Sequence, residues 1–248
     1  VGPATVDDNL IAYTNGEGML AHDASGLTVA HNLMYRNADF GLAMMVASNR
    51  YIGPDHVEAS HERVFNNLLI GNYRGCISLP TEAKLSHDNQ CDRNVLINGN
   101  WMDSYTDPTF LINHNARPER PNTKPATQRD EDDAAEPIGN LTLQQWVAAT
   151  GFDRHSLTAV VSRITILRAG QLNFEIKVDD SPLRADCLPV AGVDRDLFGR
   201  PIAKNGLMAG PFQNLKAGIN LLYFWPLPSV DRTGQELPVP CTLQPDVV

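Results

Sequence analysis

Histidine is the side chain best suited to moving protons near neutral pH, and five of the seven histidines fall in one stretch of the chain. They are His22, His31, His56, His61 and His87. A histidine base beside a positive charge can remove a proton next to a carboxylate and stabilise the resulting enolate. Arg50 and Lys84 supply positive charge in the same stretch. We therefore assign Arg50, His61 and His22 as candidate catalytic residues. His56 and Lys84 are candidate substrate-binding residues.

Carboxylates in this stretch offer a second kind of chemistry. Two carboxyl groups, one of them protonated, can hydrolyse a bond by acid–base catalysis, and their separation decides the stereochemical outcome. The available residues are Glu17, Asp23, Asp39, Asp55, Glu58 and Glu82. The further candidate substrate-binding residues are Glu17, Asp23, Asp55, Glu82 and Arg74. Neither arrangement has a spacing that identifies a reaction, so both alternatives stay open.

A metal site is a third alternative. The stretch 55–58 reads Asp-His-Val-Glu, whose oxygen ligands would suit calcium, and no other cofactor is expected. Each candidate also has a structural interpretation. His22 and Asp23 fit a turn at a strand end, and Arg74 fits a solvated ion pair with a loop acid. His61 fits the closing of its loop, and His31, just before a bend, is expected to be structural.

The elements that must position these side chains are predicted by a short sequence repeat that occurs four times between residues 6 and 100. Its marker is an asparagine followed by two apolar residues, at Asn9, Asn32, Asn67 and Asn94. Successive markers are 23, 35 and 27 residues apart, so one period recurs and is twice lengthened by inserted residues. Repeats built from short apolar segments predict stacked β-coils, in which each copy buries its apolar face against its neighbours.

Each coil is expected to hold three strands. The first set covers residues 5–8, 28–31 and 63–66, the second 10–13, 33–36 and 68–71, and the third 19–22, 42–45 and 76–79. Equivalent strands of successive coils lie side by side, so the repeat predicts three parallel sheets.

The marker asparagines are expected to form a ladder at a tight bend. Asparagine tolerates a left-handed backbone, and its side chain can bond to the equivalent asparagine of the next coil. Thr14 or Asn15, Asn37 and Asn72 predict a second, partial ladder. These residues are therefore interpreted as scaffold rather than as a binding site.

The phrase Val-x-x-Asn-x-Ile/Leu, the second asparagine and the glycine that precedes each third strand resemble the pectate-lyase-like superfamily of right-handed parallel β-helix proteins, in its bacterial polysaccharide-active type. The resemblance covers roughly residues 4–115. It implies an all-β, three-sheet solenoid in which the third strand lines a substrate groove and the loops that follow it build the groove wall. The two insertions, at 48–61 and 80–89, follow third strands.

The resemblance also implies polysaccharide as the ligand. Cleavage by a lyase is slightly ahead of cleavage by a glycoside hydrolase. The superfamily also holds non-catalytic proteins, so the alternative is a carbohydrate-binding or surface-assembly solenoid. An extracellular or periplasmic location is implied as well.

Three segments are expected: β-helix coils over residues 1–115, a Pro-rich acidic linker over 116–139, and a C-terminal capping region over 140–248. In the capping region, Thr142 and Gln145 match a capping box, and Gly151 supplies a stop, so one short helix is expected between them.

Short strands are expected further on, at residues 162–168, 172–178 and 218–225. Asp194, Arg195 and Asp196 are interpreted as a structural network.

Composition limits the classes of partner. The 248 residues are 42% hydrophobic, with a net charge of −9, and an acidic surface argues against nucleic acid. The longest apolar runs, 41–47 and 219–225, are far shorter than the roughly 20 residues of a membrane-spanning helix, so no membrane insertion is expected. The first repeat phrase opens at Val6, which would leave a bare coil end. We expect that end to pair with another chain or with missing N-terminal coils.

The four cysteines have no metal-binding spacing. Cys76 and Cys91 fall at apolar positions of the repeat and are expected in the core. Cys187 and Cys241 remain a candidate disulfide, which would suit an exported protein.

Overall fold

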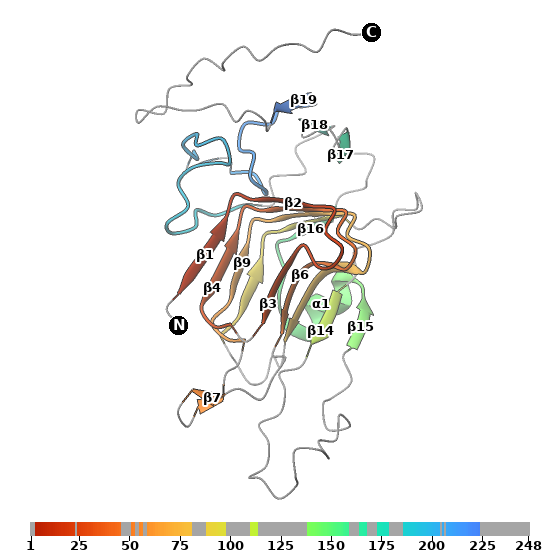
Figure 1. Cartoon of the computed structure of the whole chain (residues 1–248), viewed down its shortest axis with the longest axis vertical. Helices are drawn as coiled ribbons and strands as arrows, with labels where there is room; N and C mark the ends of the chain where they lie inside the picture. The colour runs from red at the N-terminus through yellow and green to blue at the C-terminus, as the bar shows by residue number, and fades with distance from the viewer. Residues whose placement is uncertain are drawn as a thin grey trace, which may run out of the picture.

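The computed structural model describes residues 3–22, 24–45, 51–52, 55–56, 59–80, 88–97, 110–113, 138–158, 164–167, 173–178, 186–203, 205 and 207–223. Within these ranges the chain is mostly β, with one short helix, as expected for an all-β protein. Figure 1 shows the strands of the first half of the chain running side by side in sheets, such as β1 (Ala4–Asp7), β4 (Leu27–Ala30) and β9 (Arg63–Phe65).

The three strands of each repeat go to three different sheets. Sheet A holds β1 (Ala4–Asp7), β4 (Leu27–Ala30), β9 (Arg63–Phe65) and β12 (Gln90–Asp92). Sheet B holds β2 (Leu10–Ala12), β5 (Leu33–Tyr35), β10 (Leu68–Ile70) and β13 (Val95–Ile97). Sheet C holds β3 (Met19–His22), β6 (Phe40–Met45), β11 (Gly75–Pro80) and β14 (Phe110–Asn113). These strands pair in parallel within each sheet, in chain order, so the prediction of three parallel sheets is confirmed.

Further strands extend or flank this arrangement. β16 (Leu157–Thr158) adds to sheet B beside β13, in parallel, and β15 (Ile138–Leu141) adds to sheet C beside β14, antiparallel. The strands β7 (Tyr51–Ile52) and β8 (Asp55–His56) form a small antiparallel hairpin within the first insertion.

The core between the three sheets is filled by the side chains that point inward from each strand. Equivalent positions stack from coil to coil, and the buried members include Val29, Val64, Cys91, Met34, Leu69, Leu96, Leu42, Ile77 and Leu79. Cys76 lies in the same cluster, so both cysteines of the repeat are core residues, as expected. Because equivalent side chains stack on one another, each coil buries its apolar face only when the neighbouring coils are present.

Both polar ladders form. The backbone N–H and side-chain amide of Asn32 both donate to Asn67 Oδ1, and those of Asn67 both donate to Asn94 Oδ1, at 2.9–3.1 Å. The second ladder runs from Thr14 through Asn37 to Asn72. These bonds satisfy buried polar groups at the bends, which would otherwise cost stability.

One detail of the expected bend is wrong. The left-handed residue is the one before each marker asparagine, at Asp8, His31, Asn66 and Arg93, with φ between 53° and 61°. The marker therefore keeps an ordinary backbone, and its side chain lies along the stack, while the preceding side chain turns outward.

The glycine at the start of the third strand, Gly41 in β6, has a packing cause. A Cβ on Gly41 would lie 2.6 Å from Asn72 Nδ2 and 2.7 Å from Leu69 Cδ2. Any side chain there would displace both the ladder and the core, so this position requires glycine.

The C-terminal end of the coils is closed by a short segment. The helix α1 (Leu143–Thr150) has the predicted capping box between Thr142 and Gln145, and Gly151 ends it in a left-handed conformation. Its Trp146 is fully buried and joins the core between the sheets. The prediction of one short helix is thus confirmed, and the helix covers an apolar end of the stack.

The rest of the C-terminal region packs beside the coils and not at their end. β17 (Ile164–Leu167), β18 (Asn173–Val178) and β19 (Gly218–Tyr223) form an antiparallel sheet, and their bounds agree closely with the three predicted strands. Side chains from β18, β19 and residues 198–215 share one apolar cluster with the outward side chains of sheet B. This region therefore covers the outer face of sheet B, beside the coils rather than beyond their end, as Figure 1 also shows.

Candidate functional site

The carboxyl ends of the third strands meet at one edge of sheet C, because the strands are parallel. The inserted residues of the sequence follow β6 and β11 at this edge, as expected. His22 is the last residue of β3, in register with Met45 of β6, and its side chain is exposed. His61 is exposed in the bend that leads into β9, with φ of 59°. Ser60, just before His61, bridges to Ser25, which follows His22 by three residues. Two of the three candidate catalytic residues thus lie near the same edge, which we call the carboxyl edge.

The opposite edge of sheet C holds a separate group of candidates. Arg74 is exposed and forms an ion pair with Asp39 at 3.4 Å, and its guanidinium lies 5.2 Å from the centre of the Phe40 ring. Glu17 is half-buried just before β3. Asp39 precedes Met45 by six residues, a strand length of about 20 Å. Arg74 and Glu17 therefore do not meet His22 in one site.

Several candidates cannot be placed. Asp23, Arg50, Glu82 and Lys84 lie outside the described residues. Asp55 and His56 belong to strand β8, whose backbone alone is described. Their proposed roles, and that of calcium in the 55–58 stretch, stay predictions. Within the described ranges, no group of three or more His, Cys, Asp or Glu side chains is placed to hold a metal ion.

Among the described side chains on the outer face of sheet C, those of β3 are the accessible ones. Leu20 is 44% exposed, whereas its register neighbours Ala43 and Ser78 are each 1% exposed. Among the described side chains of this face, the open positions are therefore Leu20 and His22, beside the carboxyl edge.

Four outward side chains at the first bend face the C-terminal region, and three of them bond to it. Asn66 Nδ2 donates to the Leu188 carbonyl at 2.7 Å, and the Arg93 guanidinium donates to the Asp186 carbonyl. Asp8 and His31 complete the column and face residues 196–213. These are the left-handed residues that precede the marker asparagines, so the bend itself aims them outward.

His31 is buried and structural, as expected. Its Nε2 lies 3.1 Å from Asn66 Nδ2 and its Nδ1 lies 3.2 Å from Gln213 Nε2. Gln213 Nε2 already donates to the carbonyls of Met208 and Gly210, so Nε2 of His31 accepts from Asn66 and the ring proton is assigned to Nδ1. Burial lowers the pKa of His31, which keeps the ring neutral.

One buried carboxyl group, Asp8, belongs to this column, and a second, Asp196, lies beside it. Asp8 is 9% exposed, and its burial, together with the charges of Asp7 and Asp196, raises its pKa to about 8. Asp196 is 4% exposed, and burial raises its pKa as well. Asp8 Oδ1 and Asp196 Oδ2 have no hydrogen-bond partner among the described residues. Buried carboxyls with raised pKa values are typical of functional sites, although structural networks also produce them.

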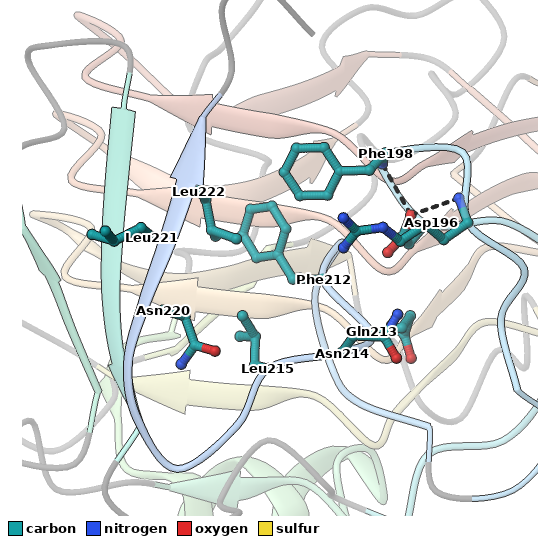
Figure 2. Close-up of a pocket in the computed structure, with 10 residues that line it drawn as sticks. Asp196, Phe198, Phe212, Gln213, Asn214, Leu215, Asn220, Leu221 and Leu222 are labelled. Carbon is teal, nitrogen blue, oxygen red and sulfur yellow. Dashed lines mark hydrogen bonds between the residues drawn. The ribbon is translucent and has the colours of Figure 1, made fainter. Parts of the chain in front are cut away.

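Asp196 opens onto a cleft. The cleft has a volume of about 170 Å³ and is lined by residues of β19 and of the turns around 196–200 and 212–215 (Figure 2). Asp196 Oδ1 accepts from the backbone N–H groups of Phe198 and Arg200 at 3.0 and 2.9 Å, the bonds drawn in Figure 2. The interpretation of residues 194–196 as a structural network therefore holds for one oxygen of Asp196, while the other oxygen has no such bond.

Sequence reasoning did not find Asp8 or this cleft. The only signal in the sequence is the polar residue before each marker asparagine, which becomes informative once the left-handed bend is known. Asp8 belongs to the first coil and Asp196 to the C-terminal region, yet the two lie close enough to interact electrostatically, and no spacing rule connects two such distant positions.

No helix in the described part of the chain is long and apolar enough to cross a membrane. Comparison of the chain with family models, with curated proteins and with solved structures finds no match.

Proposed function

We propose that this chain is a carbohydrate-active protein with the fold of a right-handed parallel β-helix. Three parallel sheets that each take one strand per repeat support the coil topology. The right-handed sense rests on a general rule, because about 98% of connections between parallel strands of one sheet are right-handed. The sequence resemblance to the pectate-lyase-like superfamily supports the same fold and the class of ligand.

The proposed binding site is the carboxyl edge with the open face of β3. The observation that carries this proposal is the joint exposure of His22 and His61 near the edge where the third strands end. Leu20 offers an exposed apolar surface on the same face, and sugars commonly combine apolar ring faces with polar edges. Insertions in the sequence follow the third strands here, and long loops on a rigid scaffold commonly carry function.

Binding is favoured over cleavage for the described residues. A lyase requires a base and a cation at one place, and a hydrolase requires two carboxyls flanking one bond. Arg74 and Asp39 lie about 20 Å along the strands from His22, and Glu17 lies about 16 Å from it. A lyase centre would instead need Arg50 or Lys84, so cleavage is kept as the second candidate. A polysaccharide ligand would place the protein outside the cytoplasm.

The test is retention on a panel of neutral and acidic polysaccharides, with unsaturated products and new reducing ends followed in the same samples. The variants are His22→Ala and Leu20→Ser, and His155→Ala is the matched control. His155 is an exposed histidine in the segment that closes the C-terminal end of the coils, where it pairs with Asp92.

We expect His22→Ala and Leu20→Ser to weaken retention while His155→Ala does not. Equal retention by all variants would place the binding surface elsewhere, and no retention on any polysaccharide would reject the proposal. New reducing ends or unsaturated products would favour the enzyme candidate over simple binding.

A further inference from the structure

The second bend of each coil, between the sheet B strand and the sheet C strand, carries exposed aromatic side chains. Tyr13 of the first coil is 53% exposed, and Tyr73 of the third coil is 58% exposed. Every other large hydrophobic side chain that is exposed in the described part of the chain is aliphatic. Exposed aromatic surface is therefore confined, among the described side chains, to this bend.

The backbone of the bend turns Tyr13 outward. Its φ is 56°, and the equivalent residues of the next two coils, Arg36 and Gly71, have φ of 49° and 62°. Glycine adopts this left-handed conformation without strain, whereas a bulky residue rarely does. Backbone strain of this kind concentrates at functional sites, so a tyrosine where glycine fits is a reason to look for a ligand.

One contact fixes the direction of the Tyr13 ring. It meets Tyr35 edge to face, with the ring centres 5.5 Å apart and the planes 80° apart. Tyr35 is itself buried, which holds the pair in place from below. About half of the Tyr13 side chain remains open to solvent, so a ligand can reach it without any movement of the core.

Tyr73 lies two coils further along the stack than Tyr13. Its N–H donates to the Asn37 carbonyl, and the N–H of Ala38 donates to the Thr14 carbonyl, so Ala38 and Tyr73 occupy one column. Neighbouring coils are about 4.8 Å apart, which separates the two tyrosines by about 10 Å along the stack. Stacked rings have their centres within about 4.5–7 Å of each other, so one ring cannot stack on both tyrosines. A ligand that uses both needs at least two rings.

Polar side chains of both charges accompany the two tyrosines. Arg36 is exposed, with its guanidinium 5.5 Å from the centre of the Tyr35 ring. Asp39 and Arg74 form their ion pair at 3.4 Å, and their side chains are 27% and 59% exposed. We call Tyr13, Arg36, Asp39, Tyr73 and Arg74 the tyrosine surface.

The mixture of charges selects for a neutral ligand with hydroxyl groups. A guanidinium only donates hydrogen bonds and an ionised carboxyl group only accepts them, whereas a hydroxyl group does both. A chain carrying one sign of charge would meet a like charge at either Asp39 or Arg74. A neutral chain avoids this repulsion and can still bond to both residues.

We propose that the tyrosine surface binds a neutral oligosaccharide, with one sugar ring stacked on Tyr13, another on Tyr73, and hydroxyl groups on the arginines and Asp39. This surface lies at the opposite edge of sheet C from His22, about 20 Å along the strands. The choice of a saccharide among neutral ligands rests on the proposed function. The location and the need for two rings rest on the exposed tyrosines alone.

The test measures binding to the full chain by ligand-observed NMR. The probes are cellopentaose, xylopentaose and mannopentaose, with glucose, xylose and mannose as the matching single rings. Tyr13→Gly removes one aromatic ring and installs the residue that the third coil has at the equivalent position, so the bend is preserved. Tyr73→Ala removes the other ring, and Tyr13→Phe keeps the first. The matched control is Leu188→Ala, which truncates a side chain that is 53% exposed beside the first bend.

We expect saturable binding of at least one pentasaccharide, weakened roughly two- to tenfold by Tyr13→Gly and by Tyr73→Ala, as for loss of one stacked ring. Tyr13→Phe and Leu188→Ala should bind as the unchanged chain does, and single sugars should bind more weakly. Absence of a saturable signal for all three pentasaccharides would overturn the proposal. Loss of affinity in only one or neither of the ring deletions, or equal affinity for a pentasaccharide and its single sugar, would overturn it as well.

The variants of the carboxyl edge separate this proposal from the proposed function. His22→Ala should leave pentasaccharide binding unchanged, because the residue lies at the far end of β3. Loss of pentasaccharide binding in His22→Ala would assign the signal to the carboxyl edge and reject the tyrosine surface. Pentasaccharide binding that depends on both tyrosines, with polysaccharide retention unaffected by His22→Ala and Leu20→Ser, would support the tyrosine surface while the carboxyl edge fails.

Discussion

The side-chain amide of Asn94 donates to Asp153 Oδ1 at 3.0 Å, so the ladder of asparagines ends on a carboxylate. Asp153 Oδ2 accepts from Trp146 Nε1 at 2.9 Å, and the Cys91 thiol also donates to it, at 3.1 Å. One buried carboxylate thus joins the last coil, the core cysteine and the helix that closes the stack. Fully satisfied buried networks of this kind are rigid, and they are costly to break at any single member.

Asp153→Asn is expected to destabilise the chain by about 1–3 kcal/mol, the cost of leaving a buried donor without an acceptor. The substitution keeps the shape and tolerates the left-handed φ of 54°, but an amide nitrogen replaces an oxygen that only donors surround. The free energy of unfolding in urea measures the effect. The control is Asp88→Asn, another left-handed aspartate, whose side chain is 56% exposed. Equal stability of Asp153→Asn and the unchanged chain would show that the network contributes nothing.

Asp8 makes stability fall as pH rises. Its pKa is raised from 3.8 to about 8, so the folded chain holds a proton that the unfolded chain releases at lower pH. Between these two values the folded state binds more protons, and the free energy of unfolding therefore decreases with increasing pH. Asp8→Asn should flatten this decrease and make the chain more stable than the unchanged protein above pH 8. Unfolding midpoints measured across pH 4–9 test this, and an unaltered slope would contradict the burial of Asp8.

Glu62 makes a second contribution to the pH dependence of stability, and it can be separated from that of Asp8. It occupies a third ladder, where Oε2 accepts from the Leu27 N–H at 3.1 Å and its own N–H donates to Asn89 Oδ1 at 2.9 Å. Burial raises its pKa from 4.5 to about 7, so its contribution to stability is also lost with increasing pH, over a lower range than that of Asp8. Glu62→Gln keeps an acceptor for Leu27 and should stabilise the chain above pH 7. Carboxyl NMR of Glu62 provides the direct measurement, and a pKa near 4.5 would refute this account.

The coils could be predicted because their information is local. Each repeat carries its own strands, asparagine and glycine at nearly fixed offsets, and the capping box of α1 lies within four residues. The third ladder was missed because Glu62 and Asn89 are different residue types, so no repeated letter marks the position. The outward column at the first bend was missed for a related reason, since the shared property of Asp8, His31, Asn66 and Arg93 is a left-handed backbone rather than a side-chain type.

The position of the C-terminal region could not be predicted from the sequence, because it depends on contacts between distant residues. Apolar residues of β18 and β19 would fit an end cap as well as a side cover, and alternation alone does not name the surface they meet. The outward side chains of sheet B, such as Leu33 and Leu68, identify this face as the covered surface only once their burial is known. The same limit applies to the cleft, which is made where two segments of this cover meet.

A substitution at Gly210 tests how tightly the C-terminal region packs against the outer face of sheet B. The N–H of Gly210 donates to the Asn66 carbonyl at 2.7 Å, its φ is +83°, and an added Cβ would lie 3.0 Å from Leu68 Cβ. Gly192 has the same kind of backbone, with φ of +85°, but open space around it, so Gly192→Ala measures the conformational cost alone, about 1–2 kcal/mol. Gly210→Ala should cost about 1–3 kcal/mol more, because overpacking is added to the same strain. The excess should appear both in urea unfolding and as faster hydrogen exchange at residues 207–215. Equal losses in the two variants would mean that the C-terminal region is not packed tightly against Leu68.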